Sequence, residues 1–495
     1  MQATNQTWSQ GRVRAEPVRP VDADRFLSVE VLTAWQRALD ERGLRATGSA
    51  AHAEYVGDLA RRLAEVGVSD VALEAVPMRR WTAREWGLRL AGPAGEPAVQ
   101  VVSPVAYSGR TGPGGVTGPL TLEPQAGGIG VVGVPLPAFT AGDFDALDWS
   151  APIPSVAEPA YAPDQRYERV WLAHDLMRAE LARFEAAGAA GLIMVIDLPE
   201  AELGSGYLLY DGVHRGIPAL FAGRDSGRVL HEAARQEAGV TLTLVADVER
   251  VDTHNIVGII PGASEELVVL QSHTDGSNGL EDNGCEAILA MAHHLARIPR
   301  QELPRSVLVL LSTGHFAIEE AWGLEAFLDR HRDDVVPRIA AALCLEHLGA
   351  RVAPAGHSDH VPGVEYEFGA CFATPHPAVI DSMRGALVRA RVTESRVLRP
   401  FVPDTTGRSP DGTTWPGDGG PFWHTAGLPA ANFITGPGYL LNVQPVMDLI
   451  DVAALRRQSI AFTEAVLELA AAPWHELRER APILTNLRRQ EEAPR

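Results

Sequence analysis

The sequence predicts an α/β fold built on a doubly wound mixed sheet that helices cover on both faces. The prediction rests on the second half of the chain, where short apolar runs alternate with amphipathic stretches from residue 253 onward. Buried parallel strands read as near-continuous apolar runs, and the helices that connect them cover both faces of the sheet. A content of 46% hydrophobic and 21% charged residues is typical of a folded globular protein.

The first quarter of the chain predicts an arm followed by helices. Residues 1–21 are polar and contain arginine and proline, so we expect an extended arm. From Ala23 to Gly67 two apolar stripes with helical spacing flank the loop Arg45-Ala46-Thr47-Gly48-Ser49. Gly67 is a suitable residue for ending the second helix.

Residues 99–250 differ in character, with glycine and proline clusters, short apolar strands and a helix over 177–187. We expect a separate β-rich module there, inserted into a discontinuous α/β domain of residues 22–98 and 251–495. The elements expected in the second segment of the α/β domain are strands at 255–260, 267–272, 306–313, 339–345, 364–368 and 429–435, and helices at 284–296, 318–330, 377–392 and 452–470.

Charge and cysteine content narrow the class of protein. The 495 residues include 43 Lys and Arg against 63 Asp and Glu, a formal charge of −20. Nucleic acids and anionic membranes both attract basic patches, so neither is expected as a partner. Three cysteines cannot form a disulfide framework, and neither a signal sequence nor an apolar run of about 20 residues is evident. We therefore expect a cytoplasmic enzyme or binding protein.

Polar side chains follow three of the expected strands, where sites form in open α/β sheets. His273 and Asp275 follow the strand at 267–272, and Asp282 opens the next helix. His315 follows the strand at 306–313, and Glu346 follows the strand at 339–345. Such convergence from separate strands is more specific than any one residue.

The residue types predict a metal site. His273, Asp282 and Glu346 offer one nitrogen and two carboxylate ligands, a set that suits a zinc ion with one open position. Cobalt or manganese would also accept these ligands. The carboxylate of Asp275 could accept the second ring N–H of His273 and so orient the ring. A metal-activated water would then serve as the nucleophile of a hydrolase.

The motifs resemble those of the aminopeptidase Y / glutamate carboxypeptidase family of zinc peptidases. His273-Thr274-Asp275 and Asp282-Asn283-Gly284 match its H-x-D and D-N-G patterns, and Arg45-Ala46-Thr47-Gly48-Ser49 resembles its R-x-x-G-S prelude. Gly427-Leu428-Pro429-Ala430 is similar to its late G-I-P strand entry. Gly216-Ile217-Pro218-Ala219 makes the 99–250 module look like the protease-associated domain often inserted in this family. The resemblance implies a zinc-exopeptidase fold over most of residues 22–472.

The resemblance also implies site roles. His273 matches a ligand of the first zinc, Asp282 the bridging carboxylate, Asp275 the orienting acid, and Glu346 replaces an aspartate ligand. The family's Glu-Glu pair of general base and second-zinc ligand aligns with His315-Phe316, and its last histidine ligand falls near Leu441-Asn442. Two ligands of a second zinc are therefore missing, which favours a single metal ion.

Several roles stay open in the sequence. His315 could be the general base, a further ligand or a packing residue. Glu319 and Glu320 could stabilise the first turn of a helix, or Glu320 could act in catalysis. If the strand persists beyond Glu346, His347 points away from the metal. The long segment 400–427 is expected to cover the site. Its candidate substrate contacts are Asp411, Trp415, Asp418, Trp423 and His424, and His424 could instead be a metal ligand.

The function predicted from these observations is metal-dependent hydrolysis of a peptide or small amide, in which an aminopeptidase activity follows from the resemblance alone. Two alternatives remain. The altered base and lost second metal could serve amide-directed lyase or cyclase chemistry. A catalytically silent homologue could instead use the cleft to bind a partner.

Overall fold

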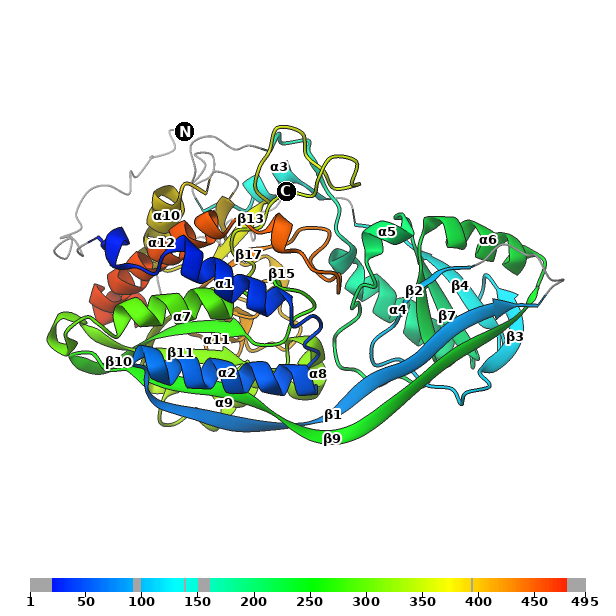
Figure 1. The fold of residues 1–495 in the computed structure, drawn as a ribbon, viewed down its shortest axis with the longest axis horizontal. Coiled ribbons are helices and arrows are strands. Elements are labelled where there is room, and N and C mark those ends of the chain that lie inside the picture. The colour runs from blue at the N-terminus through cyan, green and yellow to red at the C-terminus, as the bar shows by residue number, and fades with distance from the viewer. Residues whose placement is uncertain (1–19, 92–98, 138, 150–160, 393–394, 479–495) are drawn as a thin grey trace, which may run out of the picture.

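A computed structural model describes residues 20–91, 99–137, 139–149, 161–392 and 395–478, so residues 1–19 of the predicted arm lie outside the described part. The chain forms two lobes joined by a long curved ribbon (Figure 1). Most of the residues expected in the α/β domain lie in the larger lobe, and most of those expected in the insert lie in the smaller one (Figure 1). Residues 139–149 of the expected insert instead pack on the larger lobe, where Phe144 shares a core cluster with Leu267 and Val269. The α/β fold class is confirmed, with one mixed sheet running through both lobes.

The centre of the larger lobe is a run of parallel strands. β10 (Ser264–His273) pairs in parallel with β11 (Arg305–Ser312) on one side and with β12 (Ile339–Leu345) on the other. β12 continues in parallel to β17 (Ala430–Thr435). Because these four strands run the same way, their carboxyl ends meet at one edge of the sheet.

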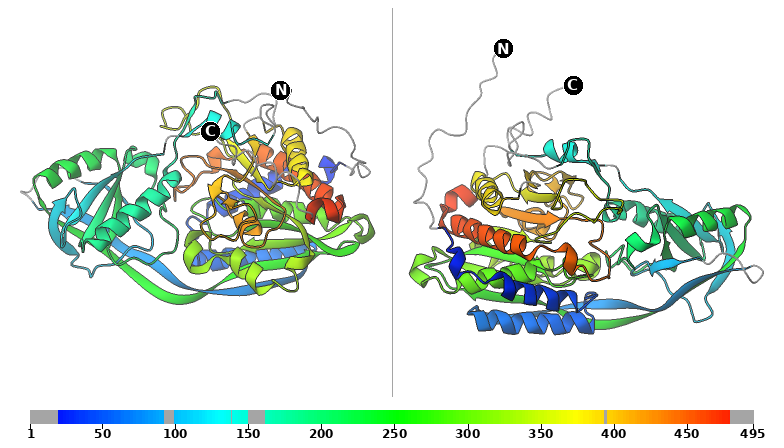
Figure 2. Two further views of the ribbon diagram at one scale, coloured as in Figure 1. Left: turned by 180° about the vertical axis from the view of Figure 1, so that it is seen from behind. Right: turned by 45° about the horizontal axis from the view of Figure 1, so that its top comes forward.

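Helices cover both faces of this sheet, as the sequence predicts. Val268 and Leu270 of β10 pack under one set of helices, while Leu267 and Val269 face the other way. The first set is α1 (Val29–Asp40), α2 (Ala50–Val66), α7 (Gly284–Leu295), α10 (Pro377–Ala390) and α12 (Val452–Ala471). The opposite face is covered by α9 (Gly323–Arg330) and α11 (Gly420–His424), and the two layers are also visible from behind (Figure 2).

The helix pair that opens the α/β domain begins at serine caps. The hydroxyl of Ser28 accepts the N–H of Val31, and that of Ser49 accepts the N–H of His52. Each serine satisfies one of the N–H groups that a helix leaves unpaired at its start. Gly67 ends α2 in the left-handed region at φ 105°, which a glycine adopts without steric cost.

A ribbon of two long antiparallel strands carries the insert. β1 (Ser69–Leu90) pairs with β9 (Gly239–Ile260) along its length, and both run from the larger lobe into the smaller (Figure 1). The predicted boundary between residues 250 and 251 therefore lies inside β9. The remaining strands of the insert's sheet are β2 (Val101–Pro104), β3 (Val116–Thr121), β4 (Ile129–Val134), β7 (Gly191–Ile196) and β8 (Ala219–Ala222).

The insert's sheet also has a helix on each face. Ile193 and Val195 of β7 pack with α6 (Arg224–Arg235), and the alternate residues pack with α4 (His174–Ala186). The short elements of the chain are β5 (Phe139–Thr140), α3 (Ala141–Asp145), β6 (Arg166–Tyr167), α5 (Glu200–Leu203), β15 (Val402–Pro403), β16 (Thr413–Thr414) and α13 (Trp474–Arg478).

The prediction of a strand at 364–368 is wrong, because the strand begins only after these residues. The sheet strand is β13 (Gly369–Ala373), which pairs in parallel with β14 (Ser395–Leu398) and antiparallel with β17. The two strands approach closely at Gly369, where a Cβ would lie 2.2 Å from the hydroxyl oxygen of Ser395. Residues before it turn toward the insert instead, where Glu367 pairs with Arg169.

The helix predicted at 318–330 is broken in two. α8 (Ile318–Ala321) and α9 are separated by Trp322, whose backbone is extended at φ −69° and ψ 106°. The break lets Gly323 donate its N–H to the carbonyl of Thr313 over 2.8 Å and accept the side-chain amide of Asn255. In the described ranges no helix is long and apolar enough to cross a membrane.

Candidate metal centre

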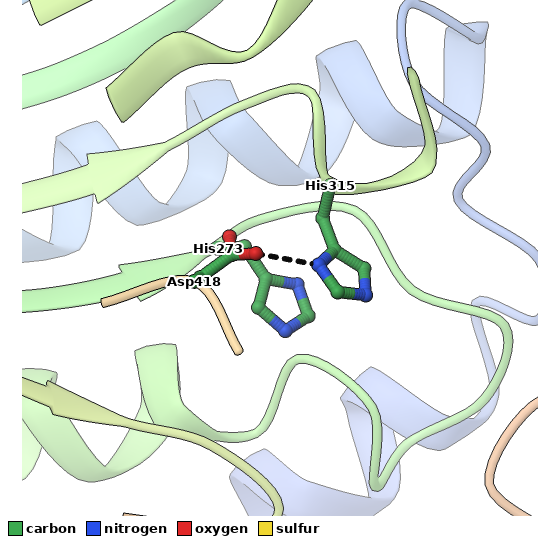
Figure 3. A group of neighbouring side chains, drawn as sticks. All are labelled: His273, His315 and Asp418. Atoms are coloured by element: carbon green, nitrogen blue, oxygen red, sulfur yellow. Dashed lines mark hydrogen bonds and ion pairs between the residues drawn. The ribbon is translucent and has the colours of Figure 1, made fainter. Parts of the chain in front are cut away.

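Five polar side chains meet where the parallel strands of the larger lobe end. His273 is the last residue of β10, His315 follows β11, and Glu346 and His347 follow β12. Asp418 reaches the same point from the 400–427 segment, just before α11. All five are at most 6% exposed, and Figure 3 shows three of them. The site therefore lies where the strand-end rule predicts.

The imidazole of His315 is held between two carboxylates. Its Nδ1 lies 2.7 Å from Oδ1 of Asp418, and its Nε2 lies 3.2 Å from Oε1 of Glu281. Burial by itself would lower the pKa of His315, but these carboxylates raise it well above the usual value. Both ring nitrogens of His315 thus face a carboxylate in this structure, an arrangement that does not favour His315 as a metal ligand.

His273 stacks on His315 with its outer nitrogen free. The two rings are nearly parallel, with centroids 4.0 Å apart and planes inclined by 15° (Figure 3). Nδ1 of His273 donates to the main-chain carbonyl of Asp275 over 2.8 Å. This bond fixes the tautomer and leaves a lone pair on Nε2, which has no hydrogen-bond partner among the described residues.

Asp275 is the partner of His273, as expected, but it bonds the ring through its main-chain carbonyl and not through its carboxylate. The carboxylate of Asp275 does not bond the ring, since its Oδ2 accepts the N–H of Phe316 over 2.8 Å and the hydroxyl of Thr47. The main-chain carbonyl of Asp275 does the orienting instead. Its carboxylate fixes the start of the segment that carries His315.

The expectation that His347 points away from the site is wrong. It assumed that the strand continues, whereas β12 ends at Leu345 and His347 adopts a left-handed φ of 57°. Nδ1 of His347 donates to the carbonyl of Thr435 over 2.5 Å, and Nε2 is buried without a partner in the described structure. Such strained backbone is typical of functional sites.

One carboxylate oxygen of Glu346 accepts hydrogen bonds, and the other has no hydrogen-bond partner in the described structure. Oε1 accepts the side-chain amide of Asn432 over 2.8 Å and the N–H of Asp418 over 3.0 Å. Oε2 lies 3.8 Å from Nε2 of His273 and has no hydrogen-bond partner within the described ranges. Burial and the charge of Asp418 raise the pKa of Glu346 to about 7.

The residues present fit a divalent cation. His273, Glu346 and His347 each offer one ligand atom, and these atoms lie within 4.8 Å of one another. Buried polar atoms normally have partners, so three unpaired atoms facing one point indicate a ligand that binds there. Two histidines and one glutamate are a known ligand set of catalytic zinc sites with an open position. A second group of His273, His315 and Asp418 overlaps the first.

Asp282 is placed differently from its expected role. Its two oxygens accept Nε and Nη2 of Arg45 over 2.8 and 2.6 Å, and both side chains are fully buried. In the described structure it belongs to neither of the two groups that could hold a metal. Because the guanidinium already neutralises this carboxylate, the arrangement in this structure does not favour Asp282 as a ligand.

Glu281 is a site residue that the sequence analysis missed. It is 1% exposed, contacts His315 through Oε1, and its Oε2 lies 3.9 Å from Nε2 of His347. Burial raises the pKa of Glu281 to about 7, a value that suits proton transfer near neutral pH. The available signal was its position, directly before the D-N-G motif.

Glu320 does not lie at the site. Its Oε2 pairs with the guanidinium of Arg79 on β1 over 2.7 Å, and its Oε1 accepts the main-chain N–H of the same residue. Glu319 pairs with Arg178 of the insert. α8 thus directs both carboxylates toward the other lobe, so the prediction of a catalytic Glu320 does not fit this geometry.

Of the proposed substrate contacts, Asp418 alone enters the cluster. Asp411 accepts bonds from Ser409, Thr413 and Trp423 and so stabilises its own loop. Trp415 is buried and donates to the side chain of Asn432 over 3.2 Å. Asn432 in turn donates to Glu346, so Trp415 reaches the cluster only through Asn432. His424 bonds Thr414 and faces Glu325 of α9, outside both metal groups found among the described residues.

An apolar cavity of about 60 Å³ adjoins the cluster. Thr435 lines it and also accepts the bond from His347, and Pro416 lines it two residues before Asp418. Aromatic side chains form most of the wall: Phe139, Phe144, Tyr167 and Trp171 from residues 139–171, and Phe368, Phe372 and Phe401 from the later part of the chain.

Three solved peptidases have a fold similar to that of this chain. A zinc aminopeptidase from Bacillus subtilis matches with a TM-score of 0.59 at 17% identity, covering 92% of this chain and 98% of that one. A peptidase M28 precursor from Shewanella amazonensis matches with 0.59 at 16%, covering 92% and 100%. An aminopeptidase from Aneurinibacillus matches with 0.56 at 15%, covering 90% and 94%. No family model and no curated sequence matches the chain. At these identities the likeness shows the fold.

Proposed function

We propose that the protein is a metal-dependent hydrolase of a peptide or small amide bond, with a single divalent cation, preferably zinc, held by His273, His347 and Glu346. The observation that carries the proposal is the convergence of three buried ligand atoms, each unpaired within the described structure. The similar fold of zinc aminopeptidases supports it. Cobalt or manganese would also suit these ligands.

A bound cation would polarise the substrate carbonyl and lower the pKa of a water molecule beside it. Glu281 is the group of this chain best suited to accept the proton, because burial raises its pKa to about 7. His315 holds Glu281 in place from Nε2 while Asp418 holds His315 from Nδ1. Burial of the whole cluster excludes bulk water, which strengthens each of these interactions.

The substrate follows from the same surroundings. We infer an amide with an apolar group next to the scissile bond, because Thr435, which accepts the hydrogen bond from His347, also lines the apolar cavity. The aminopeptidase preference is supported by the similar folds of two aminopeptidases. We assign no substrate contact to Asp411 or His424, whose side chains are bonded elsewhere.

Two measurements on the purified protein test the proposal. Elemental analysis should find about one metal ion per chain, and aminoacyl anilides or N-blocked peptides with apolar residues should be hydrolysed. Two ions would favour a two-metal mechanism. No ion and no turnover would contradict the hydrolase and favour a binding protein, and cyclised rather than hydrolysed products would favour cyclase chemistry.

A pair of variants tests the proton acceptor. Glu281→Gln should lower kcat by about 10²–10⁴-fold while the metal content stays unchanged. The matched control is Glu325→Gln, because Glu325 faces His424 as Glu281 faces His315, but outside the cluster. Equal turnover in the two variants would contradict the role of Glu281 as proton acceptor.

A further inference from the structure

A tyrosine of the insert stacks on His315 at the candidate metal centre. Tyr210 belongs to the segment 204–213, between α5 and β8. Its ring stacks on His315 with centroids 5.1 Å apart and planes inclined by 28°. The Tyr210 ring also contacts Phe316, tilted by 44° at 5.2 Å, and His174 of α4, which meets it edge-on at 4.5 Å. The rings of His273, His315 and Tyr210 thus form one continuous stack that crosses from the larger lobe to the insert.

The segment that carries Tyr210 is docked on the loop that carries His315. The carbonyl of Asp211 accepts the N–H of Glu319 over 2.8 Å. A Cβ on Gly212 would lie 2.9 Å from Cα of Ala317, so the two backbones are in close contact. Tyr207 donates its N–H to the carbonyl of Leu441 over 2.8 Å and stacks on Phe316 at 4.8 Å. The main-chain contacts of Asp211, Gly212 and Tyr207 hold the segment on the loop, and they do not depend on the Tyr207 ring.

Beneath this segment the cluster is closed. His273, Glu346 and Glu281 are at most 1% exposed, whereas Tyr210 is only half-buried and forms the outer end of the stack. A cation or an amide cannot reach buried ligand atoms unless a covering group moves. Ser205 and Leu209 hold left-handed φ values of 59° and 58°, which are unfavourable for non-glycine residues. The docking contacts therefore maintain a strained conformation.

We propose that segment 204–213 is a movable cover of the metal centre, supplied by the insert, and that Tyr210 is the positioning residue that seals it. Entry of a cation or a substrate then requires the segment to leave His315. The strain at Ser205 and Leu209 favours release once the contacts with Ala317 and Glu319 are broken. The identity of what enters rests on the proposed function, but the cover itself does not.

The test compares three variants. Tyr210→Leu removes the ring, Tyr210→Phe keeps it, and Tyr207→Leu removes the other stacked ring of the same segment, which contacts Phe316 instead of His315. In metal-loaded protein, release of the ion to an excess of chelator should be at least tenfold faster in Tyr210→Leu. It should stay within about twofold of the wild-type rate in the other two variants, because the ring over His315 remains.

A second readout works without metal. Hydroxyl-radical footprinting of His315 in metal-free protein, read by tandem mass spectrometry, should show the same order of variants. If the protein binds no metal, the proposed function fails, and footprinting still decides on the cover. Unchanged labelling of His315 in Tyr210→Leu, or equal effects of Tyr207→Leu and Tyr210→Leu in both readouts, would overturn the assignment of Tyr210.

Discussion

Asp418 lies 2.7 Å from Nδ1 of His315, although 103 residues separate the two along the chain. Asp418 comes from a long loop, and His315 follows a central strand. Attraction to His315 lowers the pKa of Asp418, although burial opposes this. The ion pair helps to fix the loop to the strand ends, together with the bond that the N–H of Asp418 donates to Glu346.

Replacing Asp418 by Asn should release His315 and lower kcat by about tenfold to hundredfold, because a charged hydrogen bond becomes a neutral one. Steady-state kinetics on an aminoacyl anilide would measure the effect. The matched control is Asp411→Asn in the same loop, since Asp411 bonds residues of its own loop. A larger loss in the control would mean that loop folding, and not His315, is what matters.

Replacing His347 by Gln should weaken metal binding by at least tenfold, because one nitrogen ligand is lost while the bond to Thr435 can be retained. Competition with a chromogenic chelator would give the affinity. His424→Gln provides the control, since His424 faces Glu325 and lies in neither metal group of the described residues. Unaltered affinity in His347→Gln would contradict its role as a ligand.

Arg45→Met should lower the free energy of unfolding by about 3–5 kcal/mol, because it leaves the charge of Asp282 buried and uncompensated. Removing both charges, in Arg45→Met with Asp282→Leu, should restore much of the loss. Urea denaturation would measure both. The exposed pair of Arg84 and Asp247 serves as the control, where Arg84→Met should cost less than about 1 kcal/mol.

Acidification should destabilise the protein through His52. Burial lowers the pKa of His52 to about 4, whereas an unfolded histidine titrates near 6.5. Between these values the unfolded chain binds more protons, so the stability from His52 is complete above pH 6.5 and is lost as the pH falls toward 4. His52→Gln should show a flatter dependence of the urea midpoint over this range. Parallel curves for the two proteins would exclude the contribution of His52.

Much of the α/β core could be predicted from local pattern. Apolar runs such as that of β10 are read directly from the sequence, because strands buried on both faces exclude polar residues. The position of His273, His315 and Glu346 at strand ends followed from the same rule. The misplaced strand at 364–368 and the broken helix at 318–330 involve tertiary contacts, such as those of Glu367 with Arg169 and of Gly323 with Thr313, which only the packed structure reveals.

The pairing of atoms at the site was harder to predict. His347 was assigned to the wrong side because its backbone turns into the left-handed region after β12 instead of continuing as an extended strand. Asp282 was expected to bind metal, but Arg45 reaches it from 237 residues away. The carbonyl rather than the carboxylate of Asp275 bonds His273, a choice between two oxygens of one residue.

The sequence by itself determined the alternation of strands and helices and the edge of the sheet at which the polar residues gather, since both depend on the order of apolar and polar residues along short stretches. The tertiary structure decided which of those residues have free lone pairs, which are neutralised, and that a tyrosine from the insert stacks on His315. Those properties depend on distances of a few ångströms between segments hundreds of residues apart, and such distances exist only once the lobes have packed together.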